Sequence, residues 1–149
     1  MPDSAYSDTI AVVLQGLQKK CWRKDKILAQ NMGISIPEFN LLTFFGQNSS
    51  VMIRELIDFL NLTPGRVTHL VSSLEDQGIL RRSPKKNDRR IVIVKLTPKG
   101  KTFVDEIQKL LRLYFNQMLS PLKQTEADTL LNSLERLGEV FDNDLELKL

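Results

Sequence analysis

The sequence predicts a mainly α-helical fold with a minor β component, and three observations support that prediction. Apolar residues recur at helical spacing over most of the 149-residue chain. Residues 91–96 instead form a run rich in β-branched side chains, which is typical of a strand. Residues 81–101 hold nine of the chain's 21 lysines and arginines and a single acid, Asp88. The predicted fold is therefore helical, with one local and strongly basic ribbon.

The composition is that of an ordinary globular chain from a reducing compartment. A length of 149 residues is enough for one domain with a substantial core. The single cysteine excludes an intramolecular disulfide framework. No apolar run approaches the roughly 18 residues that span a bilayer, and the acidic start of the chain lacks the basic region of a signal peptide. We therefore expect a cytoplasmic protein without a membrane partner.

A first helix is predicted over residues 7–30, with Ser7 or Asp8 as its cap. Its intermittent apolar stripe consists of Ile10, Val13, Leu14, Leu17, Cys21 and Leu28. Cys21 has two interpretations. Basic neighbours in the sequence lower the pKa of a thiol and make it reactive, whereas a place in the apolar stripe makes it a buried, inert thiol. We favour the inert thiol.

Two short helices follow. Ser35 and Glu38 have the spacing of a capping box, which opens a helix that Gly46 ends. Residues 47–50 form a polar loop, and residues 51–60 are predicted as a further short helix. These two helices lead through a tight turn at residues 61–62 into the next one.

The third short helix of this region has a polar outer face. Thr63 caps it, Pro64 takes its first position, and Gly78 ends it. Its buried stripe is Val67, Leu70, Val71 and Leu74. The opposite face carries Gly65, Thr68, His69, Ser72 and Asp76, with Arg66 and Ser73 at its sides. Short polar side chains of this kind can approach base-pair edges closely and exchange hydrogen bonds with them.

The basic ribbon comes directly after this helix. Residues 81–83 and 91–96 are predicted to pair as two strands across a basic loop, residues 84–90. A two-stranded ribbon joined to a polar-faced helix is the pattern of a winged helix-turn-helix. Its ribbon lies along the phosphates while its tip reaches the minor groove. Residues 35–97 are therefore predicted to form a winged helix DNA-binding lobe.

Two long helices complete the single predicted chain, residues 1–149. Thr97 and Pro98 open the first, and the second begins near Thr125. Their apolar stripes are Phe103, Ile107, Leu110, Leu111, Tyr114 and Met118, and Leu130, Leu131, Leu134, Leu137 and Phe141. These stripes exceed what the lobe needs, so residues 7–30 and 98–147 are predicted as dimerisation helices that meet a second copy. The alternative is a self-contained helical cap on the lobe.

Residues 62–101 resemble the MarR-type transcriptional regulators. The most specific part is the wing run Asn87-Asp88-Arg89-Arg90, followed at the family's spacing by Leu96-Thr97 and Gly100. The resemblance implies a homodimer, an Arg90 that enters the minor groove, and an Asp88 that orients that arginine. A turn-forming Asn87-Asp88 pair is the simpler interpretation, and the two roles do not exclude each other. The resemblance also implies a small aromatic or phenolic effector bound between the dimerisation helices and the winged lobe.

The predicted function is sequence-specific binding of double-stranded DNA, at a palindromic operator, by a homodimeric and ligand-responsive repressor. The lone His69 has no catalytic partner at a useful spacing, so no enzyme, metal or cofactor is expected. The alternative is a winged-helix module that binds another protein, and the concentrated charge of the wing favours DNA. The predicted DNA-contacting residues are Thr63, Gly65, Arg66, Thr68, His69, Ser72, Ser73, Arg82, Lys85, Lys86, Asp88, Arg89 and Arg90.

Overall fold

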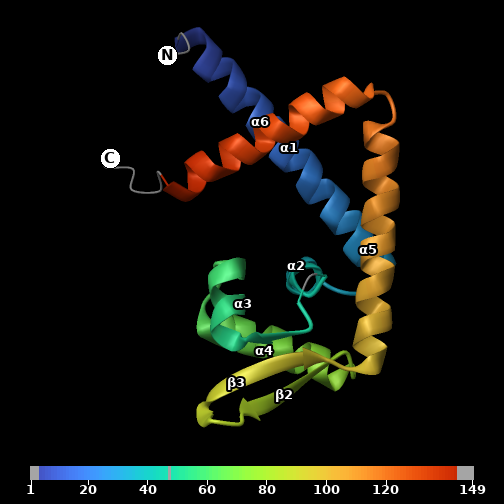
Figure 1. Cartoon of the computed structure of the whole chain (residues 1–149). Helices are drawn as coiled ribbons and strands as arrows, with labels where there is room; N and C mark the ends of the chain where they lie inside the picture. Colours follow the sequence, from blue (N-terminus) through green and yellow to red (C-terminus); the bar gives the residue numbers. More distant parts are fainter. Residues whose placement is uncertain (1–3, 47, 144–149) are drawn as a thin grey trace. The chain divides into compact units, whose positions relative to one another are not determined.

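The computed structural model describes residues 4–46 and 48–143, apart from the side chains of residues 4, 89 and 141–143. It confirms a mainly helical fold with a small β component (Figure 1). The elements are α1 (Ser4–Asn31), α2 (Ile36–Phe44), β1 (Ser50–Met52), α3 (Ile53–Leu60), α4 (Pro64–Asp76), β2 (Leu80–Lys85), β3 (Asp88–Leu96), α5 (Pro98–Leu119) and α6 (Gln124–Asn143). None of the described helices carries an apolar stretch that would take it across a membrane.

The chain divides into two compact units, residues 1–110 and 111–149. The first unit holds α1 to α4, the sheet and the first half of α5. Its core contains completely buried side chains from α2, α3, α4, the strands and α5: Phe39, Leu41, Leu42, Leu56, Val67, Val71, Leu74, Ile79, Leu80, Val94 and Ile107. Burial of each such side chain contributes about 1.5–3 kcal/mol, so this core holds the helices of the lobe together.

The sheet has three strands in the order β1-β3-β2, so the predicted two-stranded ribbon is incomplete. Val51 and Met52 were expected to open a helix, but they belong to β1 and pair with Val94 and Ile93 of β3. The reason is tertiary: Val51 is β-branched and buried, and its backbone satisfies an edge of β3 that would otherwise stay unpaired. The helix therefore begins only at Ile53.

The wing turn is shorter than the predicted loop of residues 84–90. β2 continues to Lys85 and β3 begins at Asp88, which leaves a two-residue turn. The strand register shifts between Pro84 and Lys85. This irregularity fits a proline, because proline has no backbone N–H to give to the ladder.

Most predicted helix ends are confirmed, but the starts of the first helix and of the helix predicted at residues 51–60 are not. Ser35 and Glu38 form the capping box of α2, and the Thr63 side chain accepts a hydrogen bond from the N–H of Arg66. Gly78 follows α4 with φ +72°, a left-handed conformation that favours glycine. α1 begins at Ser4, so Ser7 and Asp8 lie inside the helix and do not cap it.

Much of the apolar surface of the long helices is exposed. On α1, Ile10, Val13 and Leu17 are about half exposed, and so is Trp22. Cys21 is exposed as well, so the expected burial of its thiol is wrong for this chain. The exposed apolar side chains of α5, α6 and their connection are Leu113, Tyr114, Phe115, Met118, Leu122, Leu130, Leu131, Leu134 and Val140. Phe141 was predicted to share this stripe, but its side chain is outside the described part of the chain.

Candidate nucleic-acid interface

α4 presents the outer face that the sequence predicts. Val67, Val71 and Leu74 are completely buried on its inner side. The predicted DNA-contacting residues at its start and on its outer face are exposed, namely Thr63, Gly65, Arg66, Thr68 and His69. A buried apolar side and a free polar side fix which surface of α4 a ligand can reach. In Figure 1 this helix lies beside the β2–β3 wing.

On one flank of α4, Arg82 of β2 binds two residues of the helix. Its Nε donates to Oε2 of Glu75 at 2.9 Å and its Nη2 donates to the Ser72 hydroxyl at 3.1 Å. The Arg82 backbone N–H also donates to Oε1 of Glu75 at 3.0 Å. The backbone and side-chain bonds from Arg82 lower the pKa of Glu75. Arg82 and Ser72, both predicted to contact DNA, thus already tie the wing to α4.

On the other flank, Glu38 of α2 binds α4. Its Oε1 accepts from the Ser73 hydroxyl at 2.7 Å and from the Gln77 side-chain amide at 3.3 Å. Its Oε2 accepts from the backbone N–H and hydroxyl of Ser35 at 2.8 and 2.7 Å. Among the side chains that the structure describes, Glu38 is the only buried charged one. Ser73, a predicted DNA contact, therefore bonds inward.

These hydrogen bonds decide the charge state of Glu38. Burial alone raises the pKa of its carboxyl. Hydrogen bonds from Ser73, Ser35 and Gln77 act in the opposite direction and outweigh burial, so the pKa lies below its ordinary value. The group is therefore an ionised acceptor at neutral pH, and its bonds to α4 are charge-assisted.

At the wing tip, Asp88 bonds the backbone of Arg90. Its Oδ1 accepts from the Arg90 N–H at 3.0 Å, which is the turn-forming arrangement. Among the described side chains, no hydrogen bond joins this carboxylate to the Arg90 guanidinium. The side chains of Lys85, Lys86 and Arg90 are exposed, while that of Arg89 is outside the description. The tip thus presents several exposed, positively charged side chains on a short turn, which the bond between Asp88 and the Arg90 backbone stabilises.

The fold also brings Arg54 to the wing, a residue that the sequence reasoning missed. A groove of about 450 Å³ lies between α3 and β3, and Arg54 and Arg90 both line it. The groove's other lining residues are Met52, Ile53, Ile57, Ile91 and Val92. The sequence does single out Arg54, because it is the only lysine or arginine between Lys26 and Arg66. Only the pairing of β1 with β3 shows that it lies near the wing.

The end of α4 is joined to the start of α5. The Thr97 hydroxyl donates to the Gly78 carbonyl at 2.6 Å, and the Thr97 N–H donates to the Ile79 carbonyl at 3.0 Å. The Lys99 ammonium donates to the Gln77 carbonyl at 2.7 Å. These bonds satisfy carbonyls of the three residues that directly follow α4. They hold the two helices at one fixed junction.

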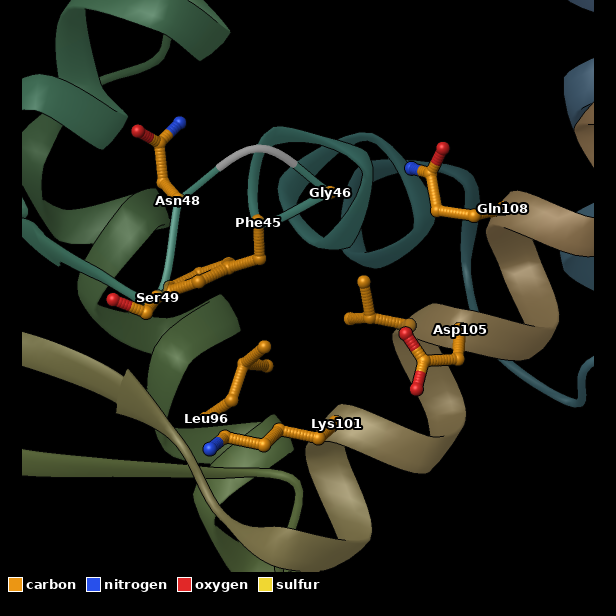
Figure 2. A pocket seen from close by; sticks show the side chains of 9 residues that line it. Phe45, Gly46, Asn48, Ser49, Leu96, Lys101, Asp105 and Gln108 are labelled. Atoms are coloured by element: carbon orange, nitrogen blue, oxygen red, sulfur yellow. The ribbon is translucent and has the colours of Figure 1, made fainter.

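A cavity of about 260 Å³ lies between the lobe and the first half of α5. Figure 2 shows Lys101, Asp105 and Gln108 projecting from α5 on one side, with Phe45 and Ser49 on the other. The remaining lining residues are Gly46, Asn48, Leu96 and Val104. The cavity thus combines an apolar wall with one ammonium, one carboxylate and amide groups. Within residues 4–46 and 48–143 no cluster of metal-ligating side chains occurs.

Comparisons with known proteins agree with this geometry. The model of the MarR family matches residues 34–92. The HTH-type transcriptional regulator YdgJ of Bacillus subtilis is 27% identical over 111 residues, which cover 74% of this chain and 68% of that protein. One curated match is an enzyme, the riboflavin kinase of Thermococcus kodakarensis. It is 36% identical over 76 residues, and the match spans 51% of this chain but only 33% of the kinase.

Solved structures share the fold over nearly the whole chain. The transcriptional regulator BldR from Sulfolobus solfataricus is 26% identical with a TM-score of 0.75, over 93% of this chain and 99% of that one. NadR in complex with 4-hydroxyphenylacetate is 18% identical with a TM-score of 0.74, over 94% of this chain and 99% of that one. These neighbours confirm the winged helix architecture that the described residues form.

Proposed function

We propose that this chain, which belongs to the MarR family of DNA-binding transcriptional regulators, is a repressor that binds double-stranded operator DNA sequence-specifically as a homodimer. One observation carries the proposal: the exposed polar face of α4 lies next to a wing that concentrates the chain's positive charge. A polyanion is attracted to such a surface, and a helix with this face can enter a major groove. We also propose that the protein acts in the cytoplasm, together with the DNA that it would bind.

The residues divide into readout and affinity. Thr68 and His69 face outward on α4 and are proposed to contact base edges, while Gly65 lets the helix approach closely. Arg90 is proposed to enter the minor groove, where a narrow groove favours an inserted arginine. Phosphate contacts are proposed for residues at the start of α4 and for basic side chains of the wing and of α3. These residues are Thr63, Arg66, Lys85, Lys86, Arg89 and Arg54. Arg82, Ser72, Ser73 and Asp88 would act by holding these groups in place.

The homodimer is supported by the exposed apolar side chains of α1, α5 and α6. Exposed apolar surface of this extent favours association with another surface of the same kind. A two-fold dimer with two winged lobes requires a palindromic operator. Its half-sites should lie about one helical turn, roughly 10 bp, apart from centre to centre.

The cavity beside α5 supports a small aromatic effector. An apolar cavity of about 150 Å³ is enough for benzene, so 260 Å³ has room for one substituted ring. Lys101 would pair with a carboxylate and Asp105 with a hydroxyl group. NadR, whose structure holds a hydroxyphenyl acid, is a precedent among the fold neighbours. With 4-hydroxyphenylacetate as the probe, the melting temperature should rise for wild type and Lys109→Ala, and should not rise for Lys101→Ala.

The named relatives are mostly transcriptional regulators, and we propose that this chain has no catalytic role. The kinase match spans a third of that enzyme, so its activity belongs to that protein alone. A winged lobe that binds a protein instead of DNA remains the alternative. It predicts no selection of duplexes and no steep salt dependence.

The deciding experiment is selection of duplexes from a random library, followed by titration at several salt concentrations. We expect one palindromic sequence to be enriched. The affinity for it should fall steeply between about 50 and 200 mM salt, because lysine and arginine side chains that bind phosphates release counterions from the DNA. An affinity that does not change with salt would contradict the proposal. Failure to enrich any duplex would favour the protein-binding alternative.

A further inference from the structure

We infer that Glu38 is a positioning residue for base readout: by binding Ser73 and Gln77, it fixes the rotation of α4 about its own axis and so aims Thr68 and His69 at the DNA. The inference rests on the proposed function, because it concerns how that function's readout helix is held. Glu38 itself is buried and would touch no nucleotide. Its effect on DNA would pass through α4 alone.

The bonds lie on the flanks of α4 that decide its rotation. Ser73 and Gln77 are one helical turn apart on one flank, directly beyond His69 on the same stripe. Ser72 and Glu75, which Arg82 binds, lie on the other flank, directly beyond Thr68. Each of the two readout side chains therefore lies one helical turn before a residue that is hydrogen-bonded to a neighbouring element. Ser73, bound by Glu38, follows His69, and Ser72, bound by Arg82, follows Thr68.

Apolar packing alone does not hold a helix at one rotation as firmly. The contacts of Val67, Val71 and Leu74 are non-directional, since hydrophobic burial depends on area. Hydrogen bonds depend on direction and on distances within a few tenths of an ångström. A side-chain tip lies roughly 5–6 Å from the helix axis, so a rotation of about 20° moves it by roughly 2 Å. A shift of that size removes a base contact.

The two oxygens of Glu38 separate the positioning role from a purely structural one. Oε2 binds Ser35 and completes the cap of α2, whereas Oε1 binds Ser73 of α4 and Gln77, the residue directly after α4. Ser35→Ala therefore damages the cap without removing a bond to α4. Ser73→Ala removes a bond to α4 and leaves the cap intact. This pair of variants is the matched comparison.

The first readout is the ratio of affinities for the duplex that wild type selects and for its single-base-pair variants. Glu38→Ala and Ser73→Ala should each lower this ratio by roughly fivefold or more, as expected when one base contact is misplaced. Ser35→Ala should lower the melting temperature and leave the ratio unchanged. Glu38→Gln keeps an acceptor for Ser73 and should retain most of the ratio. If Ser73→Ala leaves the ratio at its wild-type value, the inference is wrong.

The second readout needs no DNA. Amide hydrogen exchange should become faster in the second half of α4 for Glu38→Ala and Ser73→Ala, but only in the first turn of α2 for Ser35→Ala. If amide exchange in α4 is unchanged in both Glu38→Ala and Ser73→Ala, the inference is overturned, whatever the DNA titrations show. If wild type selects no duplex, the proposed function fails and the readout role of Glu38 fails with it. The exchange data would then report separately on the bond to α4.

Discussion

At position 100 the packing around the start of α5 leaves room only for glycine. The Thr97 hydroxyl accepts from the Gly100 N–H at 3.0 Å, so Thr97 caps α5 and Gly100 lies in its first turn. A Cβ at Gly100 would lie against the Ile79 carbonyl, deep inside van der Waals contact, and 3.2 Å from a Leu96 methyl group. Glycine is therefore required by the close approach of α5 to the Ile79 carbonyl, in the segment between α4 and β2.

Gly100→Ala should lower the free energy of unfolding by about 1–3 kcal/mol, the usual cost of overpacking a well-packed site. Denaturant unfolding of the variant measures this cost. Gly65→Ala is the control, because a Cβ there meets nothing within 4 Å. The control should unfold like wild type or slightly later. Equal stabilities for Gly100→Ala and wild type would show that the junction between α4 and α5 adjusts freely.

Arg90→Ala should reduce DNA affinity more than any other single alanine substitution in the wing while hardly changing the melting temperature. Its side chain is exposed at the tip, and exposed substitutions usually change stability by less than about 0.5 kcal/mol. Lys109→Ala on α5 removes an equal charge outside the wing and is the control. Asp88→Ala should do less harm than Arg90→Ala, and it removes the only acid of residues 81–101.

If Arg90→Ala binds DNA like wild type while Lys99→Ala or Lys101→Ala does not, the wing docks differently from the proposed arrangement. The structure gives both lysines other surroundings. Lys99 binds the carbonyl at the end of α4, and Lys101 lines the cavity beside α5. Each titration therefore needs a melting curve beside it, so that lost folding is not counted as lost contact.

At the scale of elements, two carboxylates hold α4 and should make the lobe sensitive to acid. Burial raises and the bonds from Ser73, Ser35 and Gln77 lower the pKa of Glu38, with a net result below its ordinary 4.5, and the bonds from Arg82 lower that of Glu75. A lowered pKa in the folded state contributes stability above the pKa of the unfolded chain. That stability is lost as the pH falls below about 4.5 and through the lowered values.

The measurement is the free energy of unfolding from pH 7 down to acid pH. Wild type should lose stability in that window, and the double variant Glu38→Gln/Glu75→Gln should be less stable at pH 7 but lose less on acidification. Glu55→Gln is the control, since that carboxylate caps the exposed start of α3. Parallel curves for wild type and the double variant would contradict a role for these two groups.

At the scale of the whole molecule, the exposed apolar side chains of the long helices should determine association. Wild type at micromolar concentration should sediment with twice the 17.1 kDa mass of one chain. Leu134→Asp should shift it towards a single chain, because burying an unpaired charge in an apolar interface is costly. Leu134 is about half exposed in one chain, so its replacement should leave the helical content unchanged.

Asn132→Asp adds the same charge to α6 at an exposed polar position and is the control for the dimer prediction. It should sediment like wild type. A wild-type protein that sediments only as a single chain would remove the basis for a two-fold operator. It would favour the self-contained helical cap that the sequence left as an alternative.

Local sequence patterns determined the helices and most of their ends, and they carry the resemblance to the MarR-type regulators. The Ser35–Glu38 spacing, the Thr63–Pro64 start of α4 and the stop at Gly78 all involve residues within one or two turns of each other. The relevant interactions are therefore written in adjacent residues and can be read without the fold. The same holds for the polar outer face of α4, because helical periodicity assigns each residue a direction.

Only the tertiary structure decided which partners the polar side chains have. Val51 joined a strand because the edge of β3, some forty residues later, was available to pair with it. The sequence predicts that Ser72 and Ser73 contact DNA as the outward residues do, yet Arg82 and Glu38 bind them from other elements. Periodicity says where a side chain points, but its hydrogen bonds depend on which distant groups the fold brings within about 3 Å of it.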